Sequence, residues 1–350
     1  MGGKPDQTTT EAYSVLVFII ILSIIICPLT TVLNALVIIA VKTKPRLKTM
    51  SNIILGCLAV TDGLMGLIGL PVVIAARIAT LLAETTSDFC ALQDASRNMI
   101  RTLVAATVFH LVIMNSERYV AMKHSLQYMN MVTKHRVLGF SALAWITAFF
   151  ITIPLAITAN DAYLIVTNIV LLTCVMIISY CQVVIYNETR RHEKQIAAQQ
   201  VSVETRQKFL KEKKVFKVTT IVLLTLLSTY SPILVVRIFL RNSVIKSKNV
   251  AFISFFFASF AVKLNSLVNP LIYCIRTRQF RVAFIAILLK KSNAQAEKFE
   301  MRAFASTNNN NNDNNNNNNN DNNNNDDDDD NRDSSNDSNL NNNNNNHDIN

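Results

Sequence analysis

Seven apolar stretches occupy most of the first 275 residues of this 350-residue chain. Each is about 20 residues long or longer, and a helix of that length crosses the hydrocarbon core of a bilayer. A soluble helical protein would need charged faces at helical spacing, and these stretches have almost none. The sequence therefore predicts an all-α membrane protein, a bundle of seven transmembrane helices. The expected spans are residues 15–41, 53–76, 99–122, 137–157, 163–186, 215–240 and 250–275.

Lysine and arginine gather in alternate connections between these spans. The first connection contains four basic residues between positions 42 and 48, and the fifth contains eight between positions 190 and 214. The positive-inside rule places these connections and the C-terminus in the cytoplasm, and the N-terminus outside. The net charge of +10 therefore reflects membrane topology. We expect a multi-pass protein of the plasma membrane, with the lipid bilayer and not nucleic acid as its partner.

Composition divides the chain into an extracellular N-terminus, a transmembrane domain, an amphipathic eighth helix and a cytoplasmic tail: residues 1–13, 14–275, 276–291 and 292–350. The eighth helix should lie on the inner leaflet, because Phe280, Phe284 and Leu288 share one face that basic residues flank. The tail is nearly all Asn and Asp from Asn308 onward. Such a composition cannot bury a core, so the tail is expected to be disordered.

Four residues inside the spans stand out from their apolar surroundings. Asp62 in the second span and Lys263 in the seventh are ionisable, and an ionisable group in the bilayer core usually has a function. For Asp62 the alternative is a neutral, protonated acid that holds helices together. Asn34 in the first span needs a partner on a neighbouring helix. Trp145, the only tryptophan, lies in the middle of the fourth span.

Three charged and aromatic residues, Glu117, Arg118 and Tyr119, spell E-R-Y at the cytoplasmic end of the third span. Neighbouring residues on a helix project in different directions, yet an adjacent acid and base can still pair at the membrane boundary. The alternative is a charge pair whose long side chains only extend toward water. Three residues alone form a weak motif, and the position under the third of seven spans makes it specific.

Three of the prolines inside the spans are expected to bend their helices. Pro71 should kink the outer end of the second span, and Pro232 should kink the sixth, because proline removes a backbone donor. Pro270 should bend the seventh span, where asparagine and serine side chains are available for the freed carbonyl. Asn269, Pro270 and Tyr273 form the pattern N-P-x-x-Y.

The order of these features resembles the rhodopsin-like, or class A, G-protein-coupled receptors over about residues 13–291. Seven spans, E-R-Y under the third and N-P-x-x-Y under the seventh carry the resemblance. Asn34, Asp62, Trp145, Tyr180 and Pro232 also fall at the places that the family leads one to expect. The resemblance implies a receptor that transmits an extracellular signal to a heterotrimeric G protein and catalyses no reaction.

The resemblance also implies a mechanism. Arg118 would pair with Glu117, and with Glu212 below the sixth span, in the resting state. The sixth span would swing outward at its inner end and free Arg118 to face a G protein. Tyr180 and Tyr273 would then turn inward to support it. The contact between Arg118 and its acids would then be a two-state element. Its equilibrium could be shifted by a ligand outside the cell and by a G protein inside it.

Five oxygen-bearing residues lie near one depth of the bundle. In the family, such a cluster resembles a sodium pocket that favours the resting state. A network of bridging waters is the alternative. The residues are Asp62, Thr107, Asn265, Ser266 and Asn269.

Several residues differ from the usual pattern of the family, and these differences indicate the subfamily. Gln93 stands where the usual disulfide would begin and Cys90 is one turn earlier, so no structural disulfide is expected. This feature and the minimal second outer loop resemble the melanocortin-receptor group. Tyr230 stands where the family usually has a tryptophan. Ile100 stands where amine receptors have an acid, so an amine ligand is not expected.

Lys263 admits three interpretations. Its place seven residues before Pro270 resembles the lysine of opsins, which would bind retinal as a Schiff base. Alternatively, Lys263 could join Arg97 and Arg101 in a basic pocket for an anionic ligand such as a lipid or a carboxylate. In the third interpretation Lys263 pairs internally and the arginines extend outward.

A membrane transporter is the alternative from another functional class. The internal repeats that many transporters have are not found in the sequence.

Overall fold

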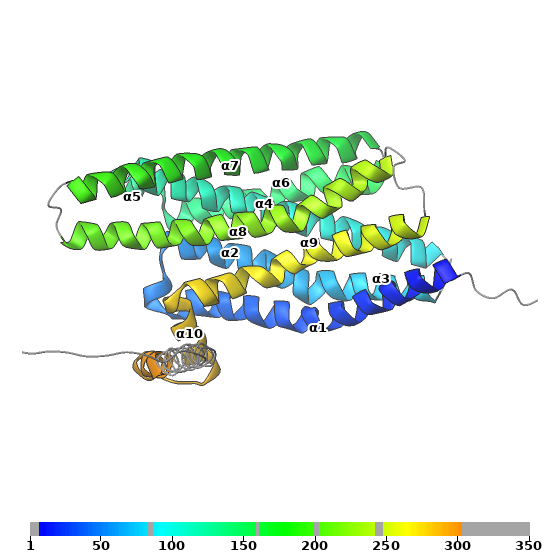
Figure 1. Cartoon of the computed structure of the whole chain (residues 1–350), viewed down its shortest axis with the longest axis horizontal. Helices are drawn as coiled ribbons and strands as arrows, with labels where there is room; N and C mark the ends of the chain where they lie inside the picture. The colour runs from blue at the N-terminus through cyan, green and yellow to red at the C-terminus, as the bar shows by residue number, and fades with distance from the viewer. Residues whose placement is uncertain (1–6, 83–86, 159–160, 199–202, 242–247, 303–350) are drawn as a thin grey trace, which may run out of the picture. The chain divides into compact units, whose positions relative to one another are not determined.

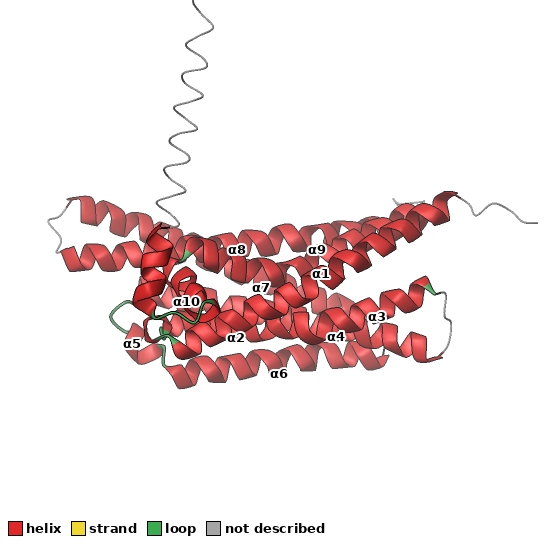
Figure 2. Ribbon diagram, turned by 90° about the horizontal axis from the view of Figure 1, so that it is seen from below, coloured by secondary structure: helices red, strands yellow, loops and turns green. Residues whose placement is uncertain are grey.

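The structure, a computed structural model, describes residues 7–82, 87–158, 161–198, 203–241 and 248–302. The described chain is helical almost throughout, and Figure 2 shows its helices joined by short loops. Seven of its segments are long and apolar enough to cross a membrane, which confirms the predicted seven-helix fold. The helices are α1 (Gln7–Thr43), α2 (Met50–Leu64), η2 (Met65–Gly69), α3 (Leu70–Leu81), α4 (Ser87–Lys123), α5 (Tyr128–Met131), α6 (Lys134–Thr158), α7 (Asp161–Ala198), α8 (Val203–Arg241), α9 (Lys248–Arg276) and α10 (Arg278–Leu288), with a 3₁₀ turn, η1 (Pro45–Leu47).

The chain divides into two compact units, Met1–Ala296 and Glu297–Asn350, and the bundle belongs to the first. Within it, α4 packs against α2, α3, α6, α7 and α8. Figure 1 shows α9 running between α1 and α8, and α9 packs against both. Buried side chains from eight of the described helices meet in one core, which includes Val37, Leu58, Leu111, Ile178, Val222 and Tyr273.

The helices on either side of the fifth connection continue past their apolar spans, as their charged sequence predicts. α7 continues to Ala198 and α8 begins at Val203. The two extensions lie side by side (Figure 1), and the Lys213 ammonium on α8 lies 2.5 Å from the Glu193 carboxylate on α7. At the outer side, only residues 159–160 separate α6 from α7, so the second outer connection is as short as expected.

The second span contains a wide turn that the sequence does not predict. η2 is a π-helical segment in which the Leu70 N–H donates to the Met65 carbonyl. The sequence predicts a kink at Pro71, and the structure instead has this π-helical turn just before the proline. Because Pro71 has no N–H, the α-helical bond at its position cannot form, and the chain accommodates an extra residue in the turn before it.

The amphipathic helix predicted at residues 276–291 is observed as α10. Phe280 is 1% exposed and packs against Tyr273, with ring centroids 6.1 Å apart. Leu288, predicted on the same face, is 62% exposed. The helix ends before Lys290, whose φ of 49° is left-handed. Much of the apolar face therefore packs on the bundle, and the face that remains for the lipid surface is smaller than predicted.

A helical stretch begins at residue 293, where the sequence predicts a disordered tail from residue 292. The Ser292 Oγ accepts a bond from the Gln295 N–H at 3.3 Å, and the Gln295 Oε1 accepts one from the Ser292 N–H at 3.2 Å. This reciprocal pair is a capping box, which starts a helix. In the second unit, residues 297–302 are helical as well. The Asn- and Asp-rich segment lies outside the described residues.

Candidate functional site

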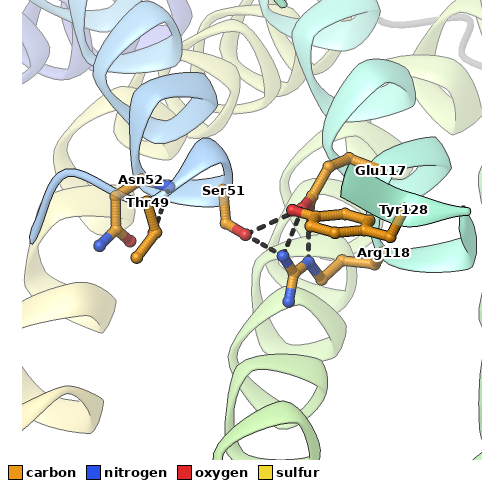
Figure 3. Close-up of polar contacts among 6 residues, drawn as sticks. All are labelled: Thr49, Ser51, Asn52, Glu117, Arg118 and Tyr128. Atoms are coloured by element: carbon orange, nitrogen blue, oxygen red, sulfur yellow. Dashed lines mark hydrogen bonds and ion pairs between the residues drawn. The ribbon is translucent and has the colours of Figure 1, made fainter. Parts of the chain in front are cut away.

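A closed cluster of polar groups surrounds the E-R-Y motif at the inner end of α4 (Figure 3). Glu117 and Arg118 are 5% and 4% exposed. The Arg118 Nε donates to the Glu117 Oε2 at 2.5 Å, and the Arg118 Nη2 donates to the other oxygen of that carboxylate. The structure therefore brings together the acid and the base that the sequence predicts as a pair.

Two further residues complete this cluster, and sequence reasoning missed both. The Ser51 hydroxyl donates to the Glu117 Oε1 at 3.0 Å and accepts a bond from the Arg118 Nη2. The Tyr128 hydroxyl donates to the same Glu117 oxygen at 2.5 Å. Ser51 comes from the first turn of α2 and Tyr128 from α5, so one carboxylate connects three elements. We refer to these four residues as the arginine cluster.

Local sequence explains how the two missed residues reach the cluster. Thr49 caps α2, because its hydroxyl accepts the Asn52 N–H at 3.3 Å, and this start of the helix places Ser51 in its first turn. Tyr128 is the first residue of α5. Burial, followed by the nearby Glu117 carboxylate, raises the pKa of the Tyr128 phenol. The phenol therefore stays protonated at neutral pH and remains a donor.

The other residues of the predicted switch that the structure describes have surroundings of their own. Tyr180 is 63% exposed on α7. Tyr273 is buried on α9, and its hydroxyl has no hydrogen-bond partner within the described part of the chain. The Tyr119 ring lies 5.2 Å from the Lys123 ammonium. The side chain of Glu212, the predicted second acid, lies outside the described residues.

A second polar connection lies one turn from Arg118 along α4. The Gln182 Nε2 on α7 donates to the Asn115 Oδ1 on α4 at 2.5 Å, and the Thr220 hydroxyl on α8 donates to the Gln182 Oε1 at 3.1 Å. Three helices are therefore connected in series. No sequence signal distinguishes these residues from other polar residues near a membrane boundary.

The predicted oxygen cluster surrounds Asp62, which is 0% exposed. The Ser266 hydroxyl and the Asn269 Nδ2 each donate to its carboxylate at 2.8 Å, and the Thr107 hydroxyl lies 3.4 Å from it. Asn34 connects this cluster to α1, because its Nδ2 donates to the Ser266 carbonyl at 3.0 Å. The structure thus gathers four of the five predicted residues at one carboxylate and gives Asn34 the partner that the sequence requires.

Buried oxygen atoms near this cluster remain unpaired. Among the described residues, the Asn265 Oδ1, the Asn269 Oδ1 and the Tyr273 hydroxyl are buried without a hydrogen-bond partner. Oxygen atoms of carboxylates, amides and hydroxyls are the ligands that hard cations prefer. A sodium ion therefore fits the donor set around Asp62, and waters would satisfy the same atoms.

Lys263 is buried on α9, where its Nζ donates to the Ser259 carbonyl at 3.1 Å. It lines a cavity of about 10 Å³ together with Arg77, whose guanidinium lies 4.2 Å from the Phe256 ring centroid. Sequence reasoning missed Arg77. The cavity is far too small for retinal, and the charged side chain beside Lys263 is a cation where a protonated Schiff base would need an anion. The site does not fit retinal.

The two arginines expected beside Lys263 have other partners. Arg97 forms an ion pair with Asp94 on the exposed surface of α4. The Arg101 Nη1 donates to the Asn98 Oδ1 at 2.9 Å. Ile100 packs against Gly69 in η2. These α4 residues do not line the Lys263 cavity, so the structure does not bring the predicted ligand-binding set into one cavity.

The remaining predicted positions are structural in this state. Trp145 contacts His110 edge to face, with ring centroids 6.5 Å apart, and the His110 Nε2 lies 2.8 Å from the Ser141 hydroxyl. Tyr230 on α8 packs against two apolar clusters, and Pro232 lies two residues further along the same helix. Where the usual disulfide would begin, the Gln93 Nε2 donates to the Thr80 hydroxyl at 2.9 Å. Cys90 is exposed with a free thiol.

Comparison with known proteins agrees with this arrangement. The family model described as 7 transmembrane receptor (rhodopsin family) matches residues 33–163 and 155–273. The adenosine receptor A2b of Gallus gallus is 32% identical over 132 residues, which cover 38% of this chain and 37% of that receptor. The 5-hydroxytryptamine receptor 1B of Equus caballus is 29% identical over 142 residues, which cover 39% and 34%. The histamine H1 receptor of Gorilla gorilla gorilla is 28% identical over 152 residues, which cover 43% and 30%.

The aligned part spans about a third of the length of these curated relatives, all of which are receptors. The family model covers much more of the chain, from the first span to the N-P-x-x-Y motif. Seven membrane-length helices occur in the same region. The chain therefore belongs to the rhodopsin family of seven-transmembrane receptors and is a multi-pass protein of the plasma membrane.

Proposed function

We propose that this receptor couples an extracellular signal to a heterotrimeric G protein, with Arg118 as the contact that the signal exposes. The observation that carries the proposal is the arginine cluster, in which Glu117 and Ser51 both bind the Arg118 guanidinium. A buried cation with its partners in place cannot bind anything else. The cluster therefore corresponds to the resting state of a two-state element.

Movement of α8 is the event that would open the cluster. Asn115, Gln182 and Thr220 connect α8 to α4 through α7, so displacement of the inner end of α8 would break the Thr220 bond first. Glu212 on α8 is proposed as a second resting partner of Arg118. In the active state Tyr180 and Tyr273 turn toward the vacated space and support the extended arginine. Binding of the extracellular ligand has to supply only the difference in free energy between the resting and the active state.

The test is nucleotide exchange on a panel of heterotrimeric G proteins, with the purified receptor in lipid nanodiscs. We expect wild-type receptor to raise exchange above that of empty nanodiscs, and Arg118→Ala to abolish the increase at equal receptor concentration. Arg136→Ala is the matched control, because that exposed arginine contacts the Asn130 and Met131 carbonyls and not the cluster. Wild-type exchange by Arg118→Ala would refute the assigned role.

We also propose that a sodium ion binds at Asp62 and favours the resting state. The support is the buried carboxylate with the Thr107, Ser266 and Asn269 side chains around it, and the unpaired Asn265 and Asn269 oxygens nearby. These residues would supply the oxygen ligands. The bound ion would supply a positive charge that compensates the carboxylate inside the bundle.

Sodium binding can be measured without a known ligand. We expect the melting temperature of the purified receptor to be higher by about 3 °C in sodium chloride than in choline chloride at the same chloride concentration. Asp62→Asn should remove the difference, because it removes the charge that attracts the ion. Asp94→Asn, a change at an exposed acid of α4, should keep it. An unchanged sodium response in Asp62→Asn would dismiss the site.

For the extracellular ligand we propose an anionic small molecule or lipid that approaches the outer end of α4. Arg97 and Arg101 lie one turn apart there and carry positive charge, and Ile100 stands where amine receptors have an acid. The free Cys90 and the two-residue outer connection after α6 support a relationship with the melanocortin-receptor group. Binding of anionic candidates that survives Arg97→Gln and Arg101→Gln together would contradict this placement.

A further inference from the structure

Two cations from different helices face one small cavity in the first unit. Arg77 on α3 and Lys263 on α9 line it, together with Ile20 and Ser23 on α1. On α9 the lining residues Phe256, Ser259 and Lys263 are three and four positions apart, which places them on one helical face. The cavity therefore lies where α1, α3 and α9 meet, apart from both the arginine cluster and Asp62.

Neither cation has an anionic partner in the part of the chain that the structure describes. The Lys263 Nζ donates to one carbonyl, that of Ser259, although an ammonium group has three donors. Arg77 stacks on the Phe256 ring, which leaves the N–H groups at the edge of the guanidinium available. The charged group that acts on Lys263 is Arg77, another cation.

Two neighbouring cations inside a membrane bundle are unfavourable unless something compensates them. Burial removes water from Lys263, which is 6% exposed, and the like charge of Arg77 adds repulsion. A bound anion would accept hydrogen bonds from the unused N–H groups. Its negative charge would offset part of the repulsion between Arg77 and Lys263. The alternative is that Lys263 has lost its proton and is neutral.

We propose that the Arg77–Lys263 cavity binds one small monovalent anion of the size of chloride. The volume of about 10 Å³ limits the size, because a space of that magnitude holds one particle about as large as water, and a monatomic halide is the anion nearest to that size. A carboxylate on an organic chain, or retinal, would not fit without displacement of the apolar wall formed by Ile19, Ile20 and Val73. The ion would connect α3 to α9 and thereby stabilise the outer half of the bundle.

The experiment is the melting temperature of the purified receptor as chloride replaces gluconate at a fixed sodium concentration. Constant sodium keeps any occupancy at Asp62 unchanged, and the measurement requires no G protein. We expect the melting temperature to rise along a saturating curve by about 3 °C. Bromide should act like chloride, and gluconate is too large to enter. A wild-type melting temperature that is the same in chloride and gluconate would overturn the proposal.

Variants assign the effect to the cavity. Lys263→Met should abolish the chloride response, and in gluconate it should be at least as stable as wild type, because it removes an uncompensated buried cation. Arg77→Gln should weaken the response. Lys123→Met is the matched control, since Lys123 is an exposed cation beside Tyr119. A chloride response that persists in Lys263→Met would also overturn the proposal.

Discussion

At the scale of single residues, the Glu117 carboxylate is the group on which the arginine cluster depends. It accepts bonds from Arg118, Ser51 and Tyr128. Hydrogen bonds to a charged group contribute about 1.5–3 kcal/mol each, and a buried carboxylate without partners is strongly unfavourable. Glu117 and Arg118 are therefore interdependent, because neither can be buried and charged without the other.

Tyr128→Phe tests this dependence with a minimal change. The variant loses one hydrogen bond to a carboxylate and keeps the ring, so we expect about 1–3 kcal/mol less stabilisation of the resting cluster. Basal nucleotide exchange should rise, and the melting temperature should fall. Tyr119→Phe is the control, because that ring packs on Lys123 and no bond from its hydroxyl to Glu117 is present in the described structure. Equal basal exchange in wild type and Tyr128→Phe would contradict this role.

The pH dependence of this contact has a definite sign. Folding raises the pKa of the Tyr128 phenol, chiefly through burial and then through Glu117. In the unfolded chain a tyrosine ionises near about pH 10. The folded protein therefore binds the proton more tightly, so this contribution to stability is complete below about pH 10 and declines above it. The melting-temperature difference between wild type and Tyr128→Phe should be constant at neutral pH and shrink in strongly alkaline buffer.

Residue types alone could predict part of these sites. Asp62 and Lys263 are recognisable because a charge within an apolar span is rare, and E-R-Y and N-P-x-x-Y are recognisable by their order. Ser51, Tyr128 and Arg77 carry no such signal. They join the sites because α2, α5 and α3 place them there, and that placement depends on packing between segments far apart in sequence.

At the scale of the elements, the wide turn η2 determines how closely the first two spans approach. Gly66 lies in this turn, and a Cβ built on it would be 2.7 Å from the Thr31 Oγ1 and 2.8 Å from the Thr31 backbone nitrogen. Backbone atoms cannot move aside as the end of a side chain can. The contact between α1 and η2 therefore requires glycine.

Gly66→Ala should consequently push the first two spans apart. We expect a loss of about 1–3 kcal/mol, as for other overpacked sites, and lower surface expression. Gly139→Ala on α6 is the matched control, because a Cβ there meets no atom within 4 Å. That variant should be neutral or slightly stabilising. A Gly66→Ala receptor with the melting temperature of wild type would show that the approach is not tight.

The elements themselves could be predicted to different degrees. The seven spans follow from apolar length, which needs no knowledge of the packing. The π turn before Pro71 could not be located, because a missing donor can be accommodated by a bend or by an extra residue. The burial of Phe280 also exceeded the prediction, since an apolar face of α10 suits the bundle and the lipid equally well.

At the scale of the whole bundle, polar groups from different helices meet at several places. The Arg77–Lys263 cavity lies among α1, α3 and α9, whereas the Asp62 cluster and the arginine cluster both connect α2 to α4. The Gln182 connection joins α8 to α4 near the arginine cluster. Under the proposed function, a displacement of α8 would act on α4 at Asn115, one turn from Arg118.

The most direct test is basal nucleotide exchange on heterotrimeric G proteins. It is measured for Glu117→Gln and for the double variant that combines Glu117→Gln with Arg118→Ala. Glu117→Gln weakens the resting partner of Arg118, so exchange should rise about tenfold, which corresponds to a shift of about 1.4 kcal/mol between the states. The double variant should lose the increase, because the arginine proposed to contact the G protein is gone. Exchange in the double variant as high as in Glu117→Gln would contradict the account.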